Sequence, residues 1–238
     1  MSYSELLFCL RQSVVERLFP IFCVECGAEG EWWCEKCLRK IKINPIKQSA
    51  VGSLDGLTAF FDYTEGTPLA KLIQEYKYSF ARDIENLWVD VTDSCHSREG
   101  GNLVLFGSGF PIKPGMIVTV IPVPLHSLRR RERGFNQSEI FAKIILNKIK
   151  KDGVDAHIKN TKFVRSRQTR QQAKLSKMER EENIKGAFVW QDMLLRAPEN
   201  IIIVDDIYTT GSTMQECAKV LKDSGAKKVY GFALAKAI

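Results

Sequence analysis

The stretch IIIVDDIYTTGST, residues 201–213, joins an apolar run to two acids and a loop of small, hydroxyl-bearing residues. Its first four residues are β-branched, which is typical of a strand buried on both faces in a parallel sheet. Apolar side chains then recur at helical spacing over residues 214–221, and Gly225 follows as a helix end. The sequence therefore predicts a buried strand, two carboxylates, a tight turn and a helix start, in that order.

This order of groups suits a sugar phosphate. A helix start presents unpaired backbone N–H groups and a partial positive charge, and small residues let a phosphate approach them. The expected phosphate contacts are Thr209, Thr210, Gly211, Ser212 and Thr213. Asp205 and Asp206 would repel a phosphate, so we expect them to accept hydrogen bonds from ribose hydroxyls or to reach a metal ion through water. An ordinary strand-to-helix turn is the alternative, while a Walker loop is excluded because the lysine of GxxxxGK(S/T) is missing.

Positive charge is concentrated in the middle of the chain. The formal net charge is +7, but residues 126–185 hold 17 Lys and Arg against 7 Asp and Glu, a net of +10 that leaves −3 elsewhere. Such a segment fits an anionic ligand, either a polyphosphate or a nucleic acid. A solvated basic surface is the alternative.

No stretch of the chain reaches the ~18 uninterrupted apolar residues of a membrane span. Residues 1–20 contain Glu5, Arg11 and Glu16, unlike a signal peptide, and their apolar spacing predicts an amphipathic helix. The simplest expectation is a cytoplasmic protein.

Four of the seven cysteines form two C-x-x-C knuckles, Cys23, Cys26, Cys34 and Cys37. Two knuckles this close together are typical of a zinc ribbon, in which four thiolates bind one Zn²⁺ tetrahedrally. Four thiolates leave no open position on the metal, so the predicted zinc is structural. A pair of disulfides is the alternative, which a reducing intracellular compartment disfavours. Cys9, Cys95 and Cys217 have no partner at ligand spacing.

A second predicted strand, residues 117–123, runs into the arginine-rich segment LHSLRRRERGFNQ, residues 125–137. Loops at the carboxyl end of parallel strands bind the ligands of α/β proteins, and arginines there would meet a polyphosphate. We expect residues 125–133 to form such a loop, with Asn136 capping the next helix. The candidate ligand contacts are His126, Arg129 and Arg133, together with Arg167 and Arg170 further along the chain. A nucleic-acid-binding loop is the alternative, and His126 is equally well explained as a plain loop residue.

The rest of the chain alternates between strand and helix patterns. Further strands are predicted at residues 57–63, 161–165, 186–190 and 227–235. Helices are predicted at residues 67–80 and from the end of Leu175-Ser176 through Asn183. Residues 94–116 interrupt this order, because they hold five of the 16 glycines and have no helical period. We interpret them as a loop insertion.

Three segments together resemble the competence protein F family (ComF, GntX-like), which has a type I phosphoribosyltransferase-like domain. They are VPLHSLRRRERGFNQ, the pattern R-x-T-x-x-Q-x-x-LS-x-x-x-R-x-x-N-x-x-GAF from Arg167, and residues 201–213. The resemblance covers nearly the whole chain except residues 94–116. It implies an α/β fold, a parallel sheet flanked by helices, with a small N-terminal zinc ribbon. We expect the helix and ribbon at 1–45 and the phosphoribosyltransferase-like domain at 46–238.

The resemblance also implies a ligand and a cellular role. The ligand would be phosphoribosyl pyrophosphate or a nucleotide, with Mg²⁺ bridging the pyrophosphate and the ribose hydroxyls. The role would be in competence and DNA uptake, with single-stranded DNA or competence and recombination proteins as partners. The oligomeric state is not predicted.

One departure from the phosphoribosyltransferase pattern leaves two classes of function open. The enzymes for 6-oxopurines carry a third carboxylate where this chain has Thr209, and a threonine hydroxyl does not take up a proton at neutral pH. The chain is then either an enzyme that moves phosphoribose to another nitrogen acceptor, or a DNA-handling or adaptor protein that uses the site as a nucleotide sensor.

Deleting residues 94–116 is expected to leave the fold intact. The free energy of closing a loop changes by only ~0.6 kcal/mol for each doubling of its length. Thermal unfolding of the deletion protein beside the full chain checks this prediction. Loss of the cooperative transition would show that the segment belongs to the core.

Overall fold

A computed structural model of the chain describes residues 20–40, 46–78, 88–89, 115–158, 162–169, 176–191 and 196–237. The predicted helix at 1–20, Arg170 and all but the last two residues of the 94–116 insertion lie outside these ranges. In the described part of the chain, no helix is long and apolar enough to cross a membrane.

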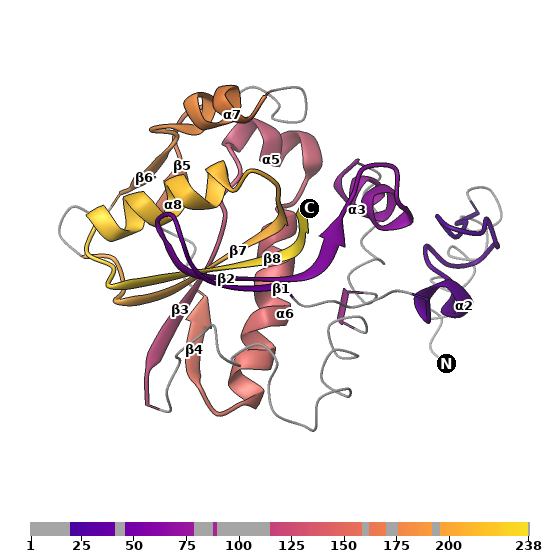
Figure 1. Ribbon diagram of the computed structural model, residues 1–238, viewed down its shortest axis with the longest axis horizontal. Coiled ribbons are helices and arrows are strands. Elements are labelled where there is room, and N and C mark those ends of the chain that lie inside the picture. The colour runs from indigo at the N-terminus through magenta and orange to yellow at the C-terminus, as the bar shows by residue number, and fades with distance from the viewer. Residues whose placement is uncertain are drawn as a thin grey trace, which may run out of the picture.

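A six-stranded sheet forms the centre of the molecule (Figure 1). Its strands are β1 (Ile46–Val51), β2 (Leu54–Tyr63), β3 (Ile117–Pro122), β4 (Asp155–Ile158), β7 (Asn200–Tyr208) and β8 (Lys228–Ala237). Their order across the sheet is β1-β2-β8-β7-β3-β4. Strand β1 pairs antiparallel with β2, and the other neighbours pair in parallel. The predicted parallel α/β sheet is thereby confirmed.

The predicted central strand is β7, which lies between β8 and β3. Ile201 and Ile203 face one core cluster, Ile202 and Val204 face the other, and all four are fully buried. The strand continues through the two acids to Tyr208, beyond the apolar run. Successive strand residues point to opposite faces, so these four side chains pack into the core on both faces of the sheet.

Helices α6 (Gln137–Lys151) and α8 (Ser212–Asp223) cover opposite faces of the sheet. Phe141 and Ile145 of α6 pack on the side of Ile202, whereas Met214 and Cys217 of α8 pack on the side of Ile201. Both helices begin at the carboxyl ends of parallel strands, where α/β proteins place their ligands.

A smaller layer covers α8. It consists of β5 (Phe163–Arg165), β6 (Phe188–Trp190) and α7 (Lys177–Ile184). The rings of Phe163 and Phe188 stack 5.6 Å apart in the cluster that also holds Cys217. Ser176 and Glu179 form the capping box that starts α7. We call this layer, residues 162–169 and 176–191, the hood.

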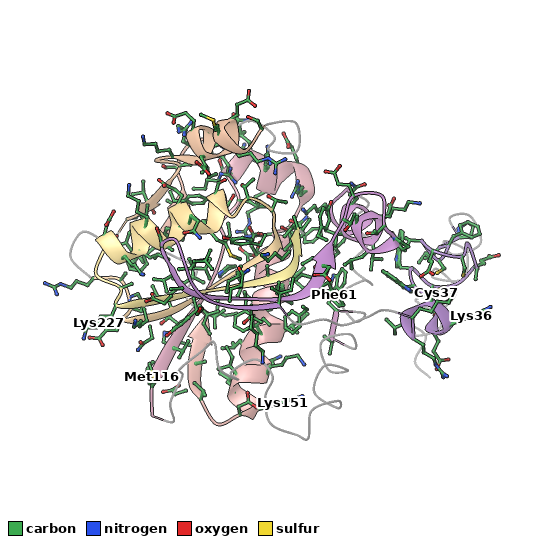
Figure 2. The ribbon with its side chains drawn as sticks, viewed as in Figure 1. Lys36, Cys37, Phe61, Met116, Lys151 and Lys227 are labelled. Carbon is green, nitrogen blue, oxygen red and sulfur yellow. The ribbon has the colours of Figure 1, made fainter. Side chains whose placement is uncertain are left out.

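The N-terminal segments join the other core cluster. Helix α3 (Pro68–Tyr78) supplies Leu72 and Tyr76, while the cysteine segment with α2 (Glu35–Leu38) supplies Trp33 and Cys37. Figure 2 shows Phe61 of β2 on the side of the sheet that faces Cys37. The cysteine segment therefore belongs to the same core cluster as α3 and Phe61 of β2.

The prediction of a loop at residues 125–133 is wrong. Residues Ser127–Arg133 form a helix, α5, which starts at His126 and ends at Gly134. The His126 side chain accepts a hydrogen bond from the amide of Leu128 at 3.4 Å, and Gly134 has the positive φ of a helix end, +74°. Leucine, arginine and glutamate favour helix, so two end signals suffice to form one here. The helix fixes the directions in which its arginine side chains point, which a loop would not do.

Candidate active site

The loop at residues 209–213 is compact and is built on one glycine. Gly211 has φ +79°, and the ring of Tyr208 occupies the place that a Cβ at Gly211 would take. The hydroxyl of Thr210 lies 2.6 Å from that of Ser212 and accepts from the Ser212 amide at 3.4 Å. Within the described residues, the amides of Thr209, Thr210 and Gly211 donate no hydrogen bond. The loop therefore presents amide and hydroxyl donors at the start of α8, as predicted.

A clamp from a distant part of the chain holds this loop. Gln215, one turn into α8, donates through Nε2 to the Tyr208 hydroxyl at 3.2 Å and to the carbonyl of Val51 at 2.8 Å. Its Oε1 accepts from the amide of Ser53 at 2.6 Å. The turn between β1 and β2 is thus fastened to the loop by one side chain. Sequence spacing gave no sign of a contact across more than 160 residues.

The two acids at the end of β7 have different partners. Asp205 accepts a hydrogen bond from the Ser138 hydroxyl at 3.0 Å, and Asp206 forms an ion pair with Lys77 of α3 at 2.6 Å. The side chains of Lys77 and Asp206 are only 18% and 19% exposed. Asn136 caps α6 as predicted, accepting from the amide of Ser138 while donating to the carbonyl of Val123, and so brings Ser138 to Asp205.

These surroundings separate the pKa values of the two carboxyls. Burial, followed by the charge of Asp206, raises the pKa of Asp205 from 3.8 to about 7. Burial also opposes the charge on Asp206, but the Lys77 ammonium outweighs it and lowers the pKa of that carboxyl. Near neutral pH, Asp206 is the anion of the pair while Asp205 holds a proton part of the time.

The predicted arginines differ in their hydrogen bonds, and the charge of Arg133 also acts on Asp206. Arg129 of α5 donates to the carbonyl of Thr169 at 3.4 Å, and Arg133 donates to the Gln137 side chain at 3.4 Å. Arg167 donates to two carbonyls at the end of α7, those of Asn183 at 3.0 Å and Lys185 at 2.7 Å. Arg167 therefore holds the hood together, whereas Arg129 and Arg133 lie on the helix that follows β3.

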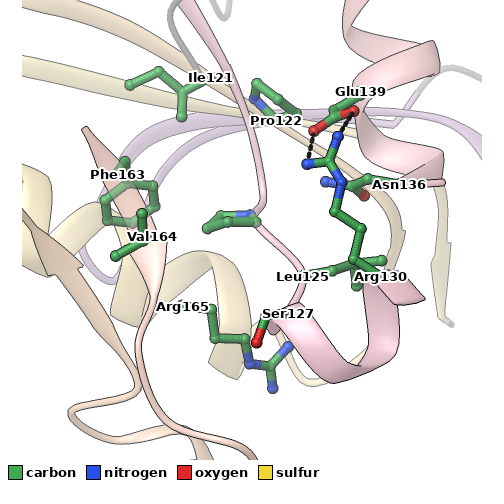
Figure 3. A pocket seen from close by; sticks show the side chains of 11 residues that line it. Ile121, Pro122, Leu125, Ser127, Arg130, Asn136, Glu139, Phe163, Val164 and Arg165 are labelled. Carbon is green, nitrogen blue, oxygen red and sulfur yellow. Dashed lines mark hydrogen bonds and ion pairs between the residues drawn. The ribbon is translucent and has the colours of Figure 1, made fainter. Parts of the chain in front are cut away.

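A cavity of about 230 Å³ lies between the end of β3, α5, the start of α6 and β5 (Figure 3). Arg165 of β5 lines it, and sequence analysis did not select this residue. Neither Asp205, Asp206 nor residues 209–213 form its walls, so it is a neighbouring compartment. The missed residues Lys77, Ser138, Arg165 and Gln215 share one trait: each is polar within a helix or strand pattern, and only folding shows what it faces.

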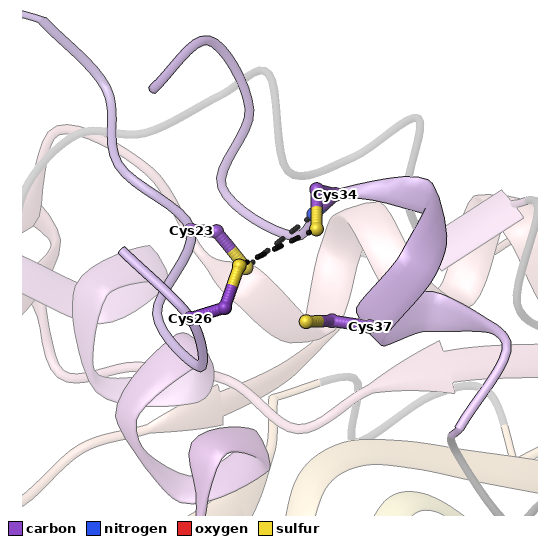
Figure 4. Close-up of side chains that lie close together, drawn as sticks. All are labelled: Cys23, Cys26, Cys34 and Cys37. Carbon is purple, nitrogen blue, oxygen red and sulfur yellow. Dashed lines mark hydrogen bonds between the residues drawn. The ribbon is translucent and has the colours of Figure 1, made fainter. Parts of the chain in front are cut away.

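The four cysteine sulfurs come together as predicted (Figure 4). All lie within 4.8 Å of one another, and the Sγ atoms of Cys26 and Cys34 are 3.6 Å apart. Four thiolates around Zn²⁺ at ~2.3 Å would lie about 3.8 Å apart, so small shifts suffice to close the shell. Although burial opposes it, hydrogen bonds from backbone amides lower the pKa of Cys23 to about 6, whereas burial and the neighbouring cysteines raise the pKa of Cys37 to about 12. The cluster can hold a metal ion.

Comparison with known proteins gives matches to the domain and to the whole chain. Residues 136–236 match the family model "Phosphoribosyl transferase domain". The chain is 27% identical to "Competence protein F" of Haemophilus influenzae, over 92% of this chain and 86% of that protein. It is 33% identical to "DNA utilization protein YhgH" of Salmonella typhi, over 91% and 84%. It is 30% identical to "Competence protein ComFC" of Bacillus subtilis, over 72% and 61%.

Asp205→Asn is expected to stabilise the protein increasingly as the pH rises from 5 to 8. The folded pKa of about 7 lies above the ordinary 3.8, so the wild type loses stability as the pH rises through this window. The asparagine side chain does not ionise, so the variant does not lose stability in this way. Urea unfolding of both proteins at pH 5, 6, 7 and 8 measures the difference. A difference that is constant with pH would contradict the raised pKa.

Proposed function

Because this chain belongs to the competence protein F family and carries a phosphoribosyltransferase domain, we propose that it binds phosphoribosyl pyrophosphate with Mg²⁺ and transfers phosphoribose to a nitrogen acceptor. One observation carries the proposal. Two part-buried carboxylates at the end of the central parallel strand run directly into a loop of small donors at the start of α8.

We assign the 5′-phosphate of the ligand to the loop at residues 209–213. The amides of Thr209, Thr210 and Gly211 and the start of a 12-residue helix supply donors and a partial positive charge. The hydroxyls of Ser212 and Thr213 add further donors.

The ribose belongs at the acids. Oδ1 of Asp205 already accepts from Ser138 and from the amide of Asp206, whereas its Oδ2 has no hydrogen bond within the described residues. That oxygen can accept from a ribose hydroxyl. Asp206 accepts from the amide of Ile207 and pairs with Lys77, which fixes its carboxylate as an anion beside the same hydroxyls.

The leaving pyrophosphate belongs toward α5. Negative charge develops on it as the C1–O bond breaks, and cations fixed nearby stabilise that charge. Arg129 and Arg133 supply guanidinium groups there, and His126 lies at the start of the same helix. Mg²⁺ bound together with the substrate would supply further positive charge to the leaving group.

A second candidate is a non-catalytic nucleotide sensor that acts in DNA handling. Two observations favour it: Thr209 stands where related enzymes have an acid, and Lys77 already pairs with Asp206. The similarity to a competence protein and to a DNA utilization protein leads us to propose a role in the uptake of DNA, exercised in the cytoplasm.

Calorimetric titration with Mg²⁺–phosphoribosyl pyrophosphate tests the binding that both candidates share. A screen for pyrophosphate release across nitrogen acceptors then separates them. Binding with release supports the enzyme, and binding without release for any acceptor supports the sensor. No binding at all would overturn both.

The variant Asp205→Asn/Asp206→Asn is expected to bind phosphoribosyl pyrophosphate at least about tenfold more weakly. Hydrogen bonds to charged groups contribute ~1.5–3 kcal/mol, and ~1.4 kcal/mol is one decade in affinity. Inorganic phosphate, which needs only the loop, should bind with unchanged or slightly higher affinity. Calorimetry with both ligands measures the two effects.

A matched control removes the cation that this variant leaves unpaired. Lys77→Gln added to the double variant shows whether a freed Lys77 attracts phosphate by itself. Equal weakening of both ligands in the folded variants would contradict the proposed division of the site. Gly211→Val is a poor probe, because its side chain would collide with the Tyr208 ring at a positive φ.

We further propose that the cysteine cluster binds one structural Zn²⁺. Purified protein should contain about one zinc per chain, and Cys26→Ser should lose it. Cys26 is exposed, so the change removes a ligand with little loss of packing, and the central sheet should stay folded. Metal analysis and circular dichroism check both outcomes. Zinc-free protein with an ordered N-terminal segment would contradict the proposal.

A further inference from the structure

The cavity beside β3 has two kinds of wall. Six apolar residues form most of its lining, Ile121, Pro122, Pro124, Leu125, Phe163 and Val164. Figure 3 shows Arg165 and Ser127 together at one end and the Arg130–Glu139 ion pair at the other. We call this compartment the arginine pocket.

Arg165 is the lining cation that forms no ion pair with a carboxylate in the described part of the chain, although the charge of Asp205 acts on it from nearby. Arg130 is neutralised by two bonds to Glu139, at 2.8 and 3.1 Å. Arg165 donates to the Thr169 hydroxyl and lies 5.5 Å from the centre of the Phe188 ring, while its buried Nε–H has no acceptor among the described residues. A guanidinium keeps its charge in proteins, so this one is available to an anion.

The surroundings of Arg165 also favour the binding of an anion. Burial, and then the positive charge of Arg129, lower the pKa of Arg165, while the charges of Cys217 and Asp205 oppose them in part. Both effects disfavour the cation in the empty pocket, and a bound carboxylate would relieve both. Arg167 lies close enough to act in the same direction.

The apolar walls decide which anion fits. A pyrophosphate is polar on every side, so burying it against proline, leucine and phenylalanine would leave most of its oxygens without donors. A planar ring with one carboxylate matches both kinds of wall. The volume of about 230 Å³ is below the ~300–1,000 Å³ of pockets for drug-sized ligands, which suits a single ring.

The pocket is also close to the acids. The end of β3 pairs with β7 at Pro122 and Val204, and the amide of Val123 donates to the carbonyl of Val204 at 2.9 Å. Asp205 is the next residue on β7. A ring in the pocket would therefore lie beside the place assigned to the ribose.

We propose that the arginine pocket binds a planar aromatic ring that carries a carboxylate, with the carboxylate on Arg165 and the ring against the apolar walls. Such a ring acid is the class of acceptor for the proposed phosphoribosyl transfer, in which a nitrogen of the acceptor bonds to C1 of the ribose as the C1–O bond to pyrophosphate breaks, and the nitrogen releases its proton to water. This second statement rests on the proposed function, whereas the binding of the ring acid does not.

The test uses two fluorinated probes that differ only in charge, 4-fluorobenzoate and 4-fluorobenzamide, followed by fluorine NMR. The wild type should bind the benzoate, and the benzamide should bind at least about tenfold more weakly. Arg165→Met should weaken the benzoate by a similar factor, while Arg165→Lys should restore only part of the loss, because lysine lacks the planar fork.

Two further variants protect the test against misfolding. Val164→Phe fills the pocket and should abolish binding of the benzoate with Arg165 intact. Arg196→Met removes an exposed arginine before β7 and should change nothing. Equal binding of the two probes, no binding by the wild type, or full binding by Arg165→Met would overturn the proposal.

Competition with pyrophosphate separates the ring acid from the leaving group. Pyrophosphate should not displace the benzoate, and its own affinity should not depend on Arg165. If it displaces the benzoate and loses affinity in Arg165→Met, the pocket serves the leaving group and the inference is wrong. Neither probe contains ribose or phosphate, so failure to bind phosphoribosyl pyrophosphate would overturn the proposed function and leave the ring-acid pocket standing.

Turnover tests the acceptor class. With Mg²⁺–phosphoribosyl pyrophosphate present, pyrophosphate release should require a ring that bears a carboxylate and a nucleophilic nitrogen, for which 2-aminobenzoate is the probe. Its amide, 2-aminobenzamide, should be at least about tenfold slower. Release with the amide alone would overturn the acceptor assignment.

Discussion

The burial of β7 on both faces is the constraint on which the rest of the structure depends. Four fully buried side chains, residues 201–204, alternate between the α6 layer and the α8 layer. Burying each stabilises the fold by ~1.5–3 kcal/mol, so together they contribute roughly 6–12 kcal/mol. That contribution lets the strand end in two adjacent carboxylates, whose partial burial is unfavourable. The end of β7 is a place where the protein accepts an electrostatic cost.

The protein limits this cost by giving each acid a different environment. Lys77 keeps Asp206 ionised, while Asp205 forms hydrogen bonds with a hydroxyl and a backbone amide of the described residues, and its pKa is raised. Two equal carboxylates would repel one another and any phosphate nearby. One anion and one group that exchanges its proton near neutral pH can bind a ribose diol while adding little negative charge beside the loop. The helix start next to them then remains attractive to the 5′-phosphate.

Distant segments supply the remaining parts of the site. Lys77 comes from α3, the clamp on the loop joins Val51 and Ser53 to Gln215, and Arg165 comes from the hood. The family match at residues 136–236 contains the hood, the acids and the loop, but not Val51, Ser53 or Lys77. The segments before β3 thus take part in the site, and they also pack against the cysteine cluster.

The sequence by itself determined the features that depend on neighbours along the chain. These are the buried strand and its acids, the helix start after Gly211, the cap at Asn136, the two cysteine knuckles and the parallel sheet. Each follows from local periodicity, side-chain chemistry or ligand spacing. Only the tertiary structure decided which charges meet, because the partners of Asp206, Tyr208 and Thr169 lie on other elements. It also replaced the expected loop at 125–133 by α5, where the end signals at His126 and Gly134 act together, and it brought Arg165 to an apolar cavity. A polar residue in a helix or strand pattern indicates only that its side chain lies outside the apolar core. Which groups that side chain contacts is decided when the helices and strands pack together.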